Sequence, residues 1–300
     1  MFVSQLFAFS ELEFVSCNCV KLTLFRAENS YFCDLKPRDH FMIDEQHLKQ
    51  FQLFFDSYME SFLQIDEDVT THIKLKYDHT LKVKKLTEEI GESLHFTETE
   101  MLLASTIALF HDLGRFQQFA EHRTFDDSKS VNHAQLSVDI LQQKQILKDL
   151  PESEQELILT AIKNHNRFEI EEVDENVSTF CKIIRDADKL DALRIMVDHY
   201  KQVNVKPNVL AHNLPVSNEV APKIVKALKN HKSVLKADVV TTTDFKLLQM
   251  GWVFDLNFKR SFQLLSEMQL IKKLYDTLPK NDQIIELYRI IKIYLENQLL

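Results

Sequence analysis

Glycine and proline are scarce in this sequence, which holds only three glycines and six prolines in 300 residues. Sandwiches, barrels and doubly wound sheets need many turns with positive φ, and three glycines cannot supply them. Helices joined by short polar connections need few such turns. Hydrophobic residues make up 45% of the chain, which is enough for a sizeable core. We therefore expect an all-α fold.

The sequence also lacks an excess of basic residues and lacks long apolar runs. Its formal net charge is -9, which argues against a long nucleic acid as partner, because such binding needs a basic face. No apolar run approaches the roughly 20 residues of a membrane helix. The apolar start, Met1 to Phe9, has no basic segment and is followed by Glu11 and Glu13, so we do not interpret it as a signal peptide. A cytoplasmic location without a membrane partner is the default expectation, and the oligomeric state stays open.

Cysteine is rare as well, with four residues in the whole chain: Cys17, Cys19, Cys33 and Cys181. The gap between Cys17 and Cys19 is too short for the usual zinc spacing, and no second pair follows. A disulfide framework is not expected at this length and number. We expect free thiols.

The chain divides into three regions by its patterning. Residues 1–41 are rich in Phe, Ser and Cys and show no sustained helical period. An amphipathic helix begins after Met42, with Asp44 as a plausible N-cap. We expect residues 1–41 to be a disordered or spurious extension, with the natural start at Met42, or else a short β-like appendage. Residues 42–205 are expected to form the helical core, and residues 206–300 to form helices that pack on it.

Capping signals mark the helices of the middle region. Thr97 and Ser153 each precede a glutamate by three residues, as in a capping box, and Gly114 is placed to end a helix. The expected helices cover residues 68–94, 97–114, 131–148, 153–166 and 176–199. A polar loop is expected over residues 115–130, and such loops often cover sites. Three more amphipathic helices are expected to fill residues 217–300.

Each of the five middle helices carries a residue that can bind a metal on or beside its apolar face. These residues are His79, His111 with Asp112, His133, His165, and the pair Asp188 and Asp191. A single buried histidine is usually a satisfied core residue. Five helices with the same feature are harder to explain in this way, because a buried, unpaired carboxylate is costly. Imidazoles and carboxylates that converge in a helical core are what a divalent metal requires.

Three segments resemble, in order, the H…HD…D signature of the HD superfamily. They are Tyr-Asp-His-Thr-Leu around His79, His-Asp-Leu-Gly-Arg from His111, and Arg-Asp-Ala-Asp-Lys-Leu-Asp around Asp188. The resemblance covers residues 70–200. It implies an HD-domain helical bundle with extra C-terminal helices. It also implies a first metal held by His79, His111, Asp112 and Asp188, with Asp112 as a bridging ligand.

Two further segments resemble members of the superfamily that bind two metals, such as the HD-GYP phosphodiesterases and the HD-fold di-iron oxygenases. These segments are Asn-His-Ala at His133 and Ile-Lys-Asn-His at His165, which would hold a second metal. No Gly-Tyr-Pro follows His165, and this departure puts cyclic-dinucleotide hydrolysis in doubt. The implied cofactor is one or two divalent ions, and His/Asp ligands suit Mn, Fe, Mg, Ni or Zn.

The function that this resemblance implies is the hydrolysis of a small phosphate ester, such as a nucleotide, by metal-activated water. The expected catalytic residues are His111, Asp112, Arg115 and Lys189. The phosphate is expected to be gripped by Arg115, Arg123 and Lys189, with Lys163 and Arg167 as further cations near the motifs. An HD-fold di-iron oxygenase and a non-catalytic metal-binding regulatory protein are the alternatives.

Several other residues keep two interpretations. Asp191 either orients a metal ligand or pairs with an arginine. His72 lies on the same helix face as His79, two turns away, and is not expected to be a ligand. The aromatic side chains of residues 115–130 either contact a base or sugar or pack on a neighbouring helix: Phe116, Phe119, His122 and Phe125. Trp252, the only tryptophan, either walls a cleft or packs in the core.

Overall fold

The computed structural model of the chain describes residues 42–201, 210 and 212–300. These residues form helices and no strands, so the predicted all-α class is confirmed. The interpretation of residues 1–41, and with it that of Cys17, Cys19 and Cys33, lies outside the described residues. Cys181 is a free, buried thiol, as expected. No helix in the described part of the chain is both long and apolar enough to span a bilayer.

Seven α-helices and one short 3-10 helix precede residue 201. Their bounds are α1 Glu45–Glu60, α2 Glu67–Ser93, α3 Glu98–Phe110, α4 Gly114–His122, η1 Asp127–Lys129, α5 His133–Gln143, α6 Glu152–Asn164 and α7 Glu175–Tyr200. The C-terminal part contains α8 Pro222–Lys229, η3 Lys236–Asp238, α9 Thr242–Gly251, η4 Trp252–Asp255, α10 Lys259–Glu267, α11 Leu270–Asp276 and α12 Asp282–Leu299. Residues 40–300 form one compact unit.

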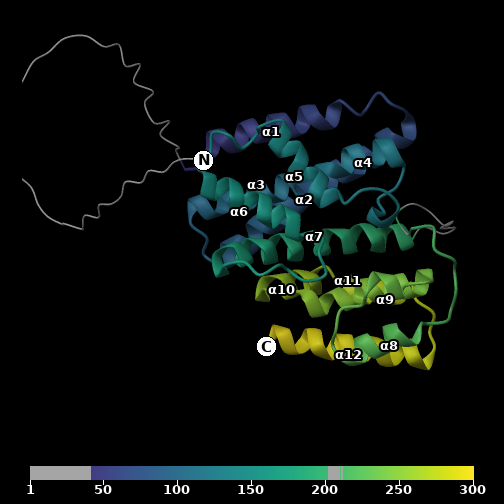
Figure 1. Cartoon of the computed structure of the whole chain (residues 1–300). Coiled ribbons are helices and arrows are strands. Elements are labelled where there is room, and N and C mark those ends of the chain that lie inside the picture. Colours follow the sequence, from purple (N-terminus) through teal and green to yellow (C-terminus); the bar gives the residue numbers. More distant parts are fainter. Residues whose placement is uncertain (1–41, 202–209, 211) are drawn as a thin grey trace, which may run out of the picture. The chain divides into compact units, whose positions relative to one another are not determined.

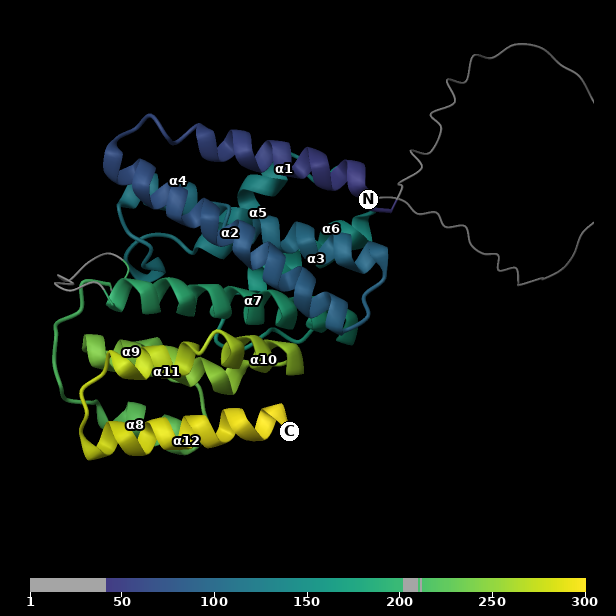
Figure 2. The same ribbon diagram turned by 180° about the vertical axis from the view of Figure 1, so that it is seen from behind.

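Helix α7 is the central element of this unit (Figure 1). On one side it packs against α2, α3 and α6, and on the other against α10 and α11. Helices α8 and α12 pack on each other in the layer farthest from α2, as the opposite view also shows (Figure 2). The buried carboxylate of Asp186 joins the two sides, because it accepts hydrogen bonds from the backbone N–H groups of Asn257 and Phe258, at 2.9 and 3.2 Å. Residues on α7 can therefore face both parts of the chain.

The predicted caps are confirmed at two helices and wrong at a third. Asp44 caps α1, and Thr97 forms a capping box with Glu100 at α3. The capping box expected at Ser153 does not form, since α6 already begins at Glu152, directly after Pro151. Proline fixes its own φ near the helical value, so the chain can enter the helix there without a side-chain cap.

The polar loop expected over residues 115–130 is largely helical, which corrects the prediction. Helix α3 ends at Phe110, and a tight turn leads into α4 at Gly114. Phe116 and Phe119 are three residues apart, both are fully buried, and they form the apolar side of α4. Gly114 does not end a helix here. It allows a close approach of two backbones, because a Cβ at this position would collide with the backbone of His133 and Ser137.

The C-terminal region contains five α-helices instead of the three expected. The apolar period runs through residues 259–276, but the chain breaks it at Gln269, which adopts a left-handed φ of 54° between α10 and α11. A similar break follows Gly251, where α9 gives way to the 3-10 turn η4. Periodicity alone does not reveal such breaks, because the apolar residues on both sides face the same core.

Candidate metal centre

The six predicted ligands converge at one place between α2, α3, α5, α6 and α7. His79 lies within α2 and Asp188 within α7, whereas the others stand at helix ends. All except Asp188 are buried. Three overlapping groups each place possible ligand atoms within 4.8 Å of one another: His79, His111 and Asp112; His111, His165 and Asp188; and Asp112, His133 and His165.

Asp112 lies between two pairs of histidines. Its Oδ2 is 3.5 Å from Nε2 of His79 and 3.7 Å from Nε2 of His111. Its Oδ1 is 3.3 Å from Nε2 of His133 and 3.7 Å from Nε2 of His165. Each carboxylate oxygen therefore faces one pair of imidazoles, so Asp112 could contribute to two ions if both were bound.

Asp188 completes the side of the first pair. Its Oδ1 lies 3.1 Å from Nε2 of His79 and 3.8 Å from Nε2 of His111. The first half of the centre thus offers two imidazoles and two carboxylates, and the second half offers two imidazoles and the shared carboxylate of Asp112.

The outward nitrogen of each histidine has an acceptor that fixes the ring. Nδ1 of His111 donates to the carbonyl of Ala108 and Nδ1 of His165 to the carbonyl of Ile162, both at 2.7 Å. Both histidines directly follow a helix, so the same local geometry recurs. Because a carbonyl only accepts, the proton must sit on Nδ1, and Nε2 keeps its lone pair for the interior.

The other two histidines are fixed by carboxylates. Nδ1 of His79 donates to Oδ2 of Asp191 at 2.8 Å, and Nδ1 of His133 donates to Oδ2 of Asp127 at 2.7 Å. Carboxylate–histidine pairs of this kind set the tautomer and raise the basicity of a metal-ligating imidazole. All four rings therefore turn Nε2 toward the shared interior point.

These inward nitrogens are poorly satisfied by the protein alone. Nε2 of His79 and Nε2 of His111 are buried and find no hydrogen-bond partner within the described residues. Nε2 of His133 and Nε2 of His165 face each other at 3.0 Å. Two imidazole lone pairs at this distance repel unless a cation or a proton lies between them. The donor set therefore fits a divalent metal, and the residues present could hold one or two ions.

The electrostatics of the histidines agree with this fit. Burial lowers the pKa of His111 to about 4 and the pKa of His133 to about 3, so both rings are neutral ligands at neutral pH. Burial also lowers the pKa of His79, but the adjacent carboxylates of Asp188 and Asp191 outweigh it, and the net shift is upward. The carboxylates thus favour a positive charge beside His79, which a proton or a metal can supply.

The carboxylates stay ionised despite their surroundings. Burial raises the pKa of Asp112, but Lys76 and the neighbouring histidines reverse this and hold it well below 3.8. Burial likewise raises the pKa of Asp188, and the neighbouring His79 more than compensates, so the net shift is downward. Both side chains are therefore charged and able to bind a cation.

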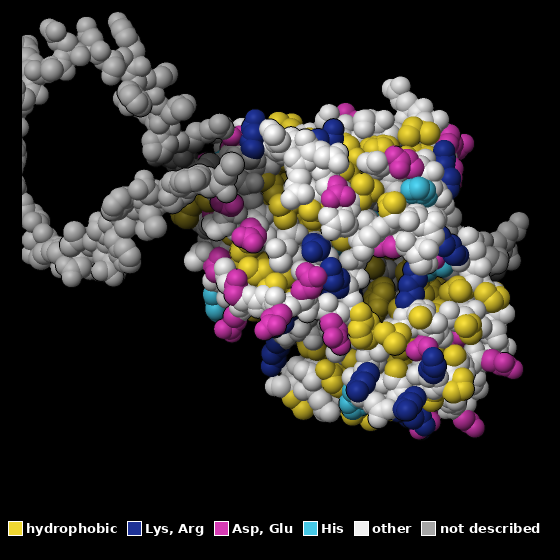
Figure 3. All heavy atoms as spheres, in the orientation of Figure 1, with side chains coloured by type: hydrophobic (Ala, Val, Ile, Leu, Met, Phe, Trp, Pro, Cys, Tyr) yellow, Lys and Arg dark blue, Asp and Glu magenta, His cyan; other side chains and the backbone are white. Residues whose placement is uncertain are grey.

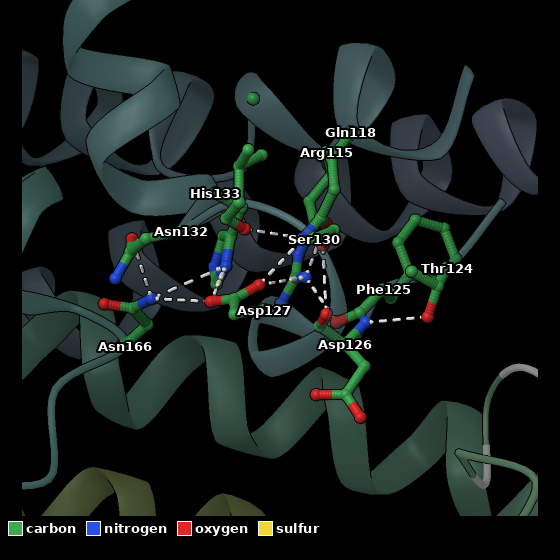
Figure 4. Close-up of polar contacts among 12 residues, drawn as sticks. Arg115, Gln118, Thr124, Phe125, Asp126, Asp127, Ser130, Asn132, His133 and Asn166 are labelled. Atoms are coloured by element: carbon green, nitrogen blue, oxygen red, sulfur yellow. Dashed lines mark hydrogen bonds and ion pairs between the residues drawn. The ribbon is translucent and has the colours of Figure 1, made fainter. Parts of the chain in front are cut away.

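Asp127 is a candidate site residue that the sequence did not reveal. It lies in η1, between Arg115, His133 and Asn166 (Figure 4). Its Oδ1 accepts from NH1 of Arg115 at 3.0 Å and from Gln118 at 2.9 Å, and its Oδ2 accepts from Asn166 at 3.0 Å as well as from His133. The available signal was weak, since it consisted of an acidic pair six residues before a histidine in an irregular segment.

Lys76 was also missed, although it precedes His79 by one helical turn. Its Nζ lies 2.7 Å from Oδ2 of Asp112, and it stands over the ring of Phe125 at 5.5 Å from the centroid. This ammonium is therefore the cation nearest to the bridging carboxylate. The signal for it was its place on the same face of the helix as His79.

The predicted phosphate-binding cations lie in different places. Arg115 is close to the centre, with Nε 3.5 Å from Oδ1 of Asp112. Lys189 lines the same cleft and pairs with Asp255 at 2.8 Å, while burial lowers its pKa. Arg123 does not line this cleft, and its guanidinium pairs with Asp66 at 2.7 Å.

Of the other two cations near the motifs, Arg167 lines the cleft and pairs with Glu171 at 2.8 Å. Lys163 also approaches Glu171, at 3.8 Å, and does not line the cleft. Both interpretations of Asp191 apply. It accepts from Nδ1 of His79 and so orients that ring, and it also accepts from Nε of Arg194 at 2.6 Å.

The aromatic residues named from the sequence also lie in different places: in the core, on the surface or along the cleft. His72 stacks on Phe119, with ring centroids 4.2 Å apart, and is not part of the metal centre. Phe116 and Phe119 pack in the core, and His122 lies on the surface. Phe125 and Trp252 line the cleft.

The cleft beside the metal centre has a volume of about 660 Å³. Asp112, His133, His165 and Asp188 line it, so the candidate ligands are open to a bound molecule. The face shown in Figure 3 has a hollow with hydrophobic side chains around it and Lys or Arg side chains beside it. A site of this size holds a small organic molecule, and clefts of about 300–1,000 Å³ are usual for such ligands.

Comparison with known families gave one match. The family model of the HD domain matches residues 77–193, which include all six candidate ligands. Neither the curated proteins nor the solved structures gave a match.

Proposed function

Since residues 77–193 form an HD domain and place the chain in the HD superfamily, whose members are mostly metal-dependent phosphohydrolases, we propose that the protein hydrolyses a small phosphate ester in this cleft. The observation that carries the proposal is the orientation of the four histidines. Each donates from Nδ1 to a fixed acceptor and turns Nε2 toward Asp112 or Asp188. The four Nε2 lone pairs and the carboxylates of Asp112 and Asp188 therefore face one another, and a bound cation would be favourable beside all of them.

Two metal positions follow from the donor set. His79, His111, Asp112 and Asp188 would hold one ion, and His133, His165 and Asp112 would hold the other. A bound divalent metal would lower the pKa of a coordinated water and neutralise phosphoryl oxygens. The protein supplies four donors to the first position and three to the second. A molecule in the cleft could reach both positions, because Asp112, His133, His165 and Asp188 line it.

Cations of the chain surround the place where the phosphate would bind. Lys76 and Arg115 stand on opposite oxygens of Asp112, and Lys189 stands farther along the same cleft. We assign to Lys76 and Arg115 the neutralisation of phosphate oxygens next to the metals. Lys189 would contact the phosphate in exchange for its present partner Asp255. Arg123, which pairs with Asp66 outside the cleft, has no part in this proposal.

The test combines metal analysis with a turnover screen. Purified protein is analysed for its metals, stripped with a chelator, reloaded separately with Mn, Mg, Fe, Ni or Zn, and offered nucleotides, sugar phosphates and simple phosphate esters. We expect phosphate release that depends on the metal. Asp188→Asn should abolish it, whereas Asp198→Asn, which changes an exposed carboxylate on the same helix, should not.

Other results would redirect the proposal. Bound iron together with oxygen consumption and no phosphate release would indicate the di-iron oxygenase alternative, because the same donors suit iron. Tight metal binding without turnover of any phosphate ester would indicate a non-catalytic role.

A further inference from the structure

The cleft has a second wall that comes from outside the HD domain. Residues 233–255 contribute nine of its lining side chains, and most of these are apolar: Val234, Leu235, Ala237, Phe245, Leu248 and Trp252. The family model ends at residue 193, so this wall is particular to the C-terminal helices. The metal-bearing side of the cleft is polar and charged, whereas this side is mainly hydrocarbon.

The charged groups of the second wall are already engaged by the HD domain. Nζ of Lys236 lies 2.7 Å from Oδ1 of Asp126. Oδ2 of Asp255 lies 2.7 Å from Arg185 and 2.8 Å from Lys189. Ser233 is the one remaining polar side chain that this segment adds to the lining. What the wall offers to a ligand is therefore apolar surface with few free polar partners.

Two large hydrophobic residues at this cleft are exposed. Phe168 is 51% exposed and Leu235 is 49% exposed, and both line the cleft. Apolar surface left in water costs free energy in proportion to its area, and a bound ligand with an apolar part would cover it. The cleft volume of about 660 Å³ also leaves room for more than a phosphate group.

From this wall we infer that the substrate is a phosphate ester of a hydrophobic alcohol, with an aliphatic or aromatic organic part, and not a sugar phosphate. A sugar phosphate would bury several hydroxyl groups against a wall that has one free hydroxyl, and unpaired buried hydroxyls are costly. The inference rests on the proposed function for the position of the phosphate. Trp252, Phe168 and Leu235 are then the residues that select the substrate.

The chain provides its own binding probe, because Trp252 is its only tryptophan and lines the cleft. Its fluorescence, excited at the red edge of the indole band, would be followed in the metal-loaded full chain during titration with non-hydrolysable phosphonates. We expect phenylphosphonate and hexylphosphonate to bind at least about tenfold more tightly than methylphosphonate. Glucose 6-phosphate, added under conditions without turnover, should bind no better than methylphosphonate.

Two variants and one control test the exposed apolar lining of the cleft, with Leu235 in the second wall and Phe168 on the side of the HD domain. Phe168→Ala and Leu235→Ser should each reduce the preference for phenylphosphonate over methylphosphonate by several fold, because each removes exposed apolar surface from the cleft. Leu53→Ser, which changes a leucine of α1 that is 69% exposed and does not line the cleft, should leave the preference unchanged.

The outcomes separate this inference from the proposed function. Equal binding of all phosphonates, tighter binding of glucose 6-phosphate, or no binding at all would overturn the inference. If phosphate esters are hydrolysed without any preference for hydrophobic ones, the proposed function stands and this inference fails. If hydrophobic phosphonates bind selectively but no ester is hydrolysed, the proposed hydrolysis fails and with it the assignment of a substrate, and only the selectivity of the cleft for hydrophobic phosphonates stands.

Discussion

The HD domain and the C-terminal helices bury different kinds of side chain, although helices of both regions pack against α7. The interior of the HD domain contains histidines, aspartates and an arginine, among them His111, Asp112, Arg185 and Asp191. The region from α8 to α12 buries mainly aliphatic and aromatic side chains, and its buried polar residues are few: Thr243, Asp244, Gln249 and Ser261. One of these, Asp244, belongs to the capping box of α9.

This difference shows how the two regions share their tasks. Buried charges that face one another stabilise a fold little and become costly when a partner is removed. The HD domain therefore holds the candidate metal centre at some expense of its own stability. The C-terminal helices bury one carboxylate, Asp244 of the α9 capping box, among their described residues, and they stabilise the unit mainly through apolar burial while shaping one wall of the cleft. Substitutions of the candidate ligands should reduce metal binding. Substitutions in the core of the C-terminal helices should reduce stability and leave metal binding unchanged.

The largest expected effect is that of His111→Ala on the metal centre. This variant removes one donor of the first position, and turnover should fall by more than about 100-fold, beyond the loss that is typical of an outer partner. The metal-stripped variant should also lose stability, because the fully buried ring leaves a cavity and its Nδ1 loses the hydrogen bond to the carbonyl of Ala108, so metal is counted per folded molecule. Metal content and thermal unfolding with chelator, measured on the same preparations, test both parts.

His122→Ala is the control for this comparison, since it changes an exposed histidine on α4. It should alter neither metal content nor turnover. A His111→Ala protein that keeps its metal and its activity would contradict the division of tasks.

The second effect should appear in stability without a change in metal binding. Ile284 is fully buried in α12 and does not line the cleft. Ile284→Ala leaves a cavity and should lower the free energy of unfolding by about 2–5 kcal/mol. Metal bound per folded molecule should stay constant. Ile293→Ala, on an exposed face of the same helix, should cost far less, and denaturant titration compares the two.

The third effect is a pH dependence that originates in the HD domain. The pKa of His111 is lowered to about 4 and that of His133 to about 3 by burial, so the unfolded chain binds their protons near pH 6.5 while the folded protein does not. The unfolded state then holds more protons, and stability falls as the pH is lowered. Between pH 6.5 and 5 each histidine contributes a loss of about 2 kcal/mol, which the raised pKa of His79 partly offsets.

Chemical denaturation of the metal-stripped protein at pH 7 and at pH 5 measures this loss. Saturating metal should shift the loss to lower pH, because the metal competes with protons for the same nitrogens. Equal stability of the stripped protein at both pH values would contradict the assignment of neutral, buried imidazoles.

The sequence was sufficient to identify the residues that converge. His79, His111, His133 and His165 could be recognised because each ends or interrupts an apolar helix face, and such faces must point inward. The N-cap at Asp44 and the capping box at Thr97 placed the starts of α1 and α3. Local signals of this kind act over three or four residues, so one sequence can reveal them.

The residues that the sequence did not reveal depend on contacts between distant segments. Lys236 meets Asp126 across 110 residues, and Asp255 meets Arg185 across 70, and neither pairing has a local pattern. Polar residues outnumber apolar ones in residues 115–122, so the sequence favours a loop there. Two phenylalanines, Phe116 and Phe119, are buried on one side of this segment and stabilise the helix instead. The second wall of the cleft was hidden for the same reason, since residues 233–255 meet the metal-bearing side only in the folded chain.

Asp127 gives the sharpest test of the metal centre, because it contacts only one half of it. Its Oδ2 accepts from Nδ1 of His133 at 2.7 Å, whereas His79 and His111 are held by other acceptors. Asp127→Asn keeps an acceptor oxygen but loses the charge and places an amide against other donors. We expect the affinity for one of two metals to fall by about 10–100-fold, with the other metal unchanged.

Calorimetric titration of the stripped protein with Mn or Zn would resolve the two steps. Asp126→Asn is the matched control, because this neighbouring carboxylate faces Lys236 and His212, neither of which is a candidate ligand, and it should change both binding steps much less. Asp112 is the one ligand common to both proposed metal positions. If Asp127→Asn weakens the binding of one metal selectively, the weakened step belongs to the position of His133 and His165. Equal weakening of both steps would instead mean that the two positions behave as one, and that Asp112 couples them more strongly than its two separate oxygens indicate.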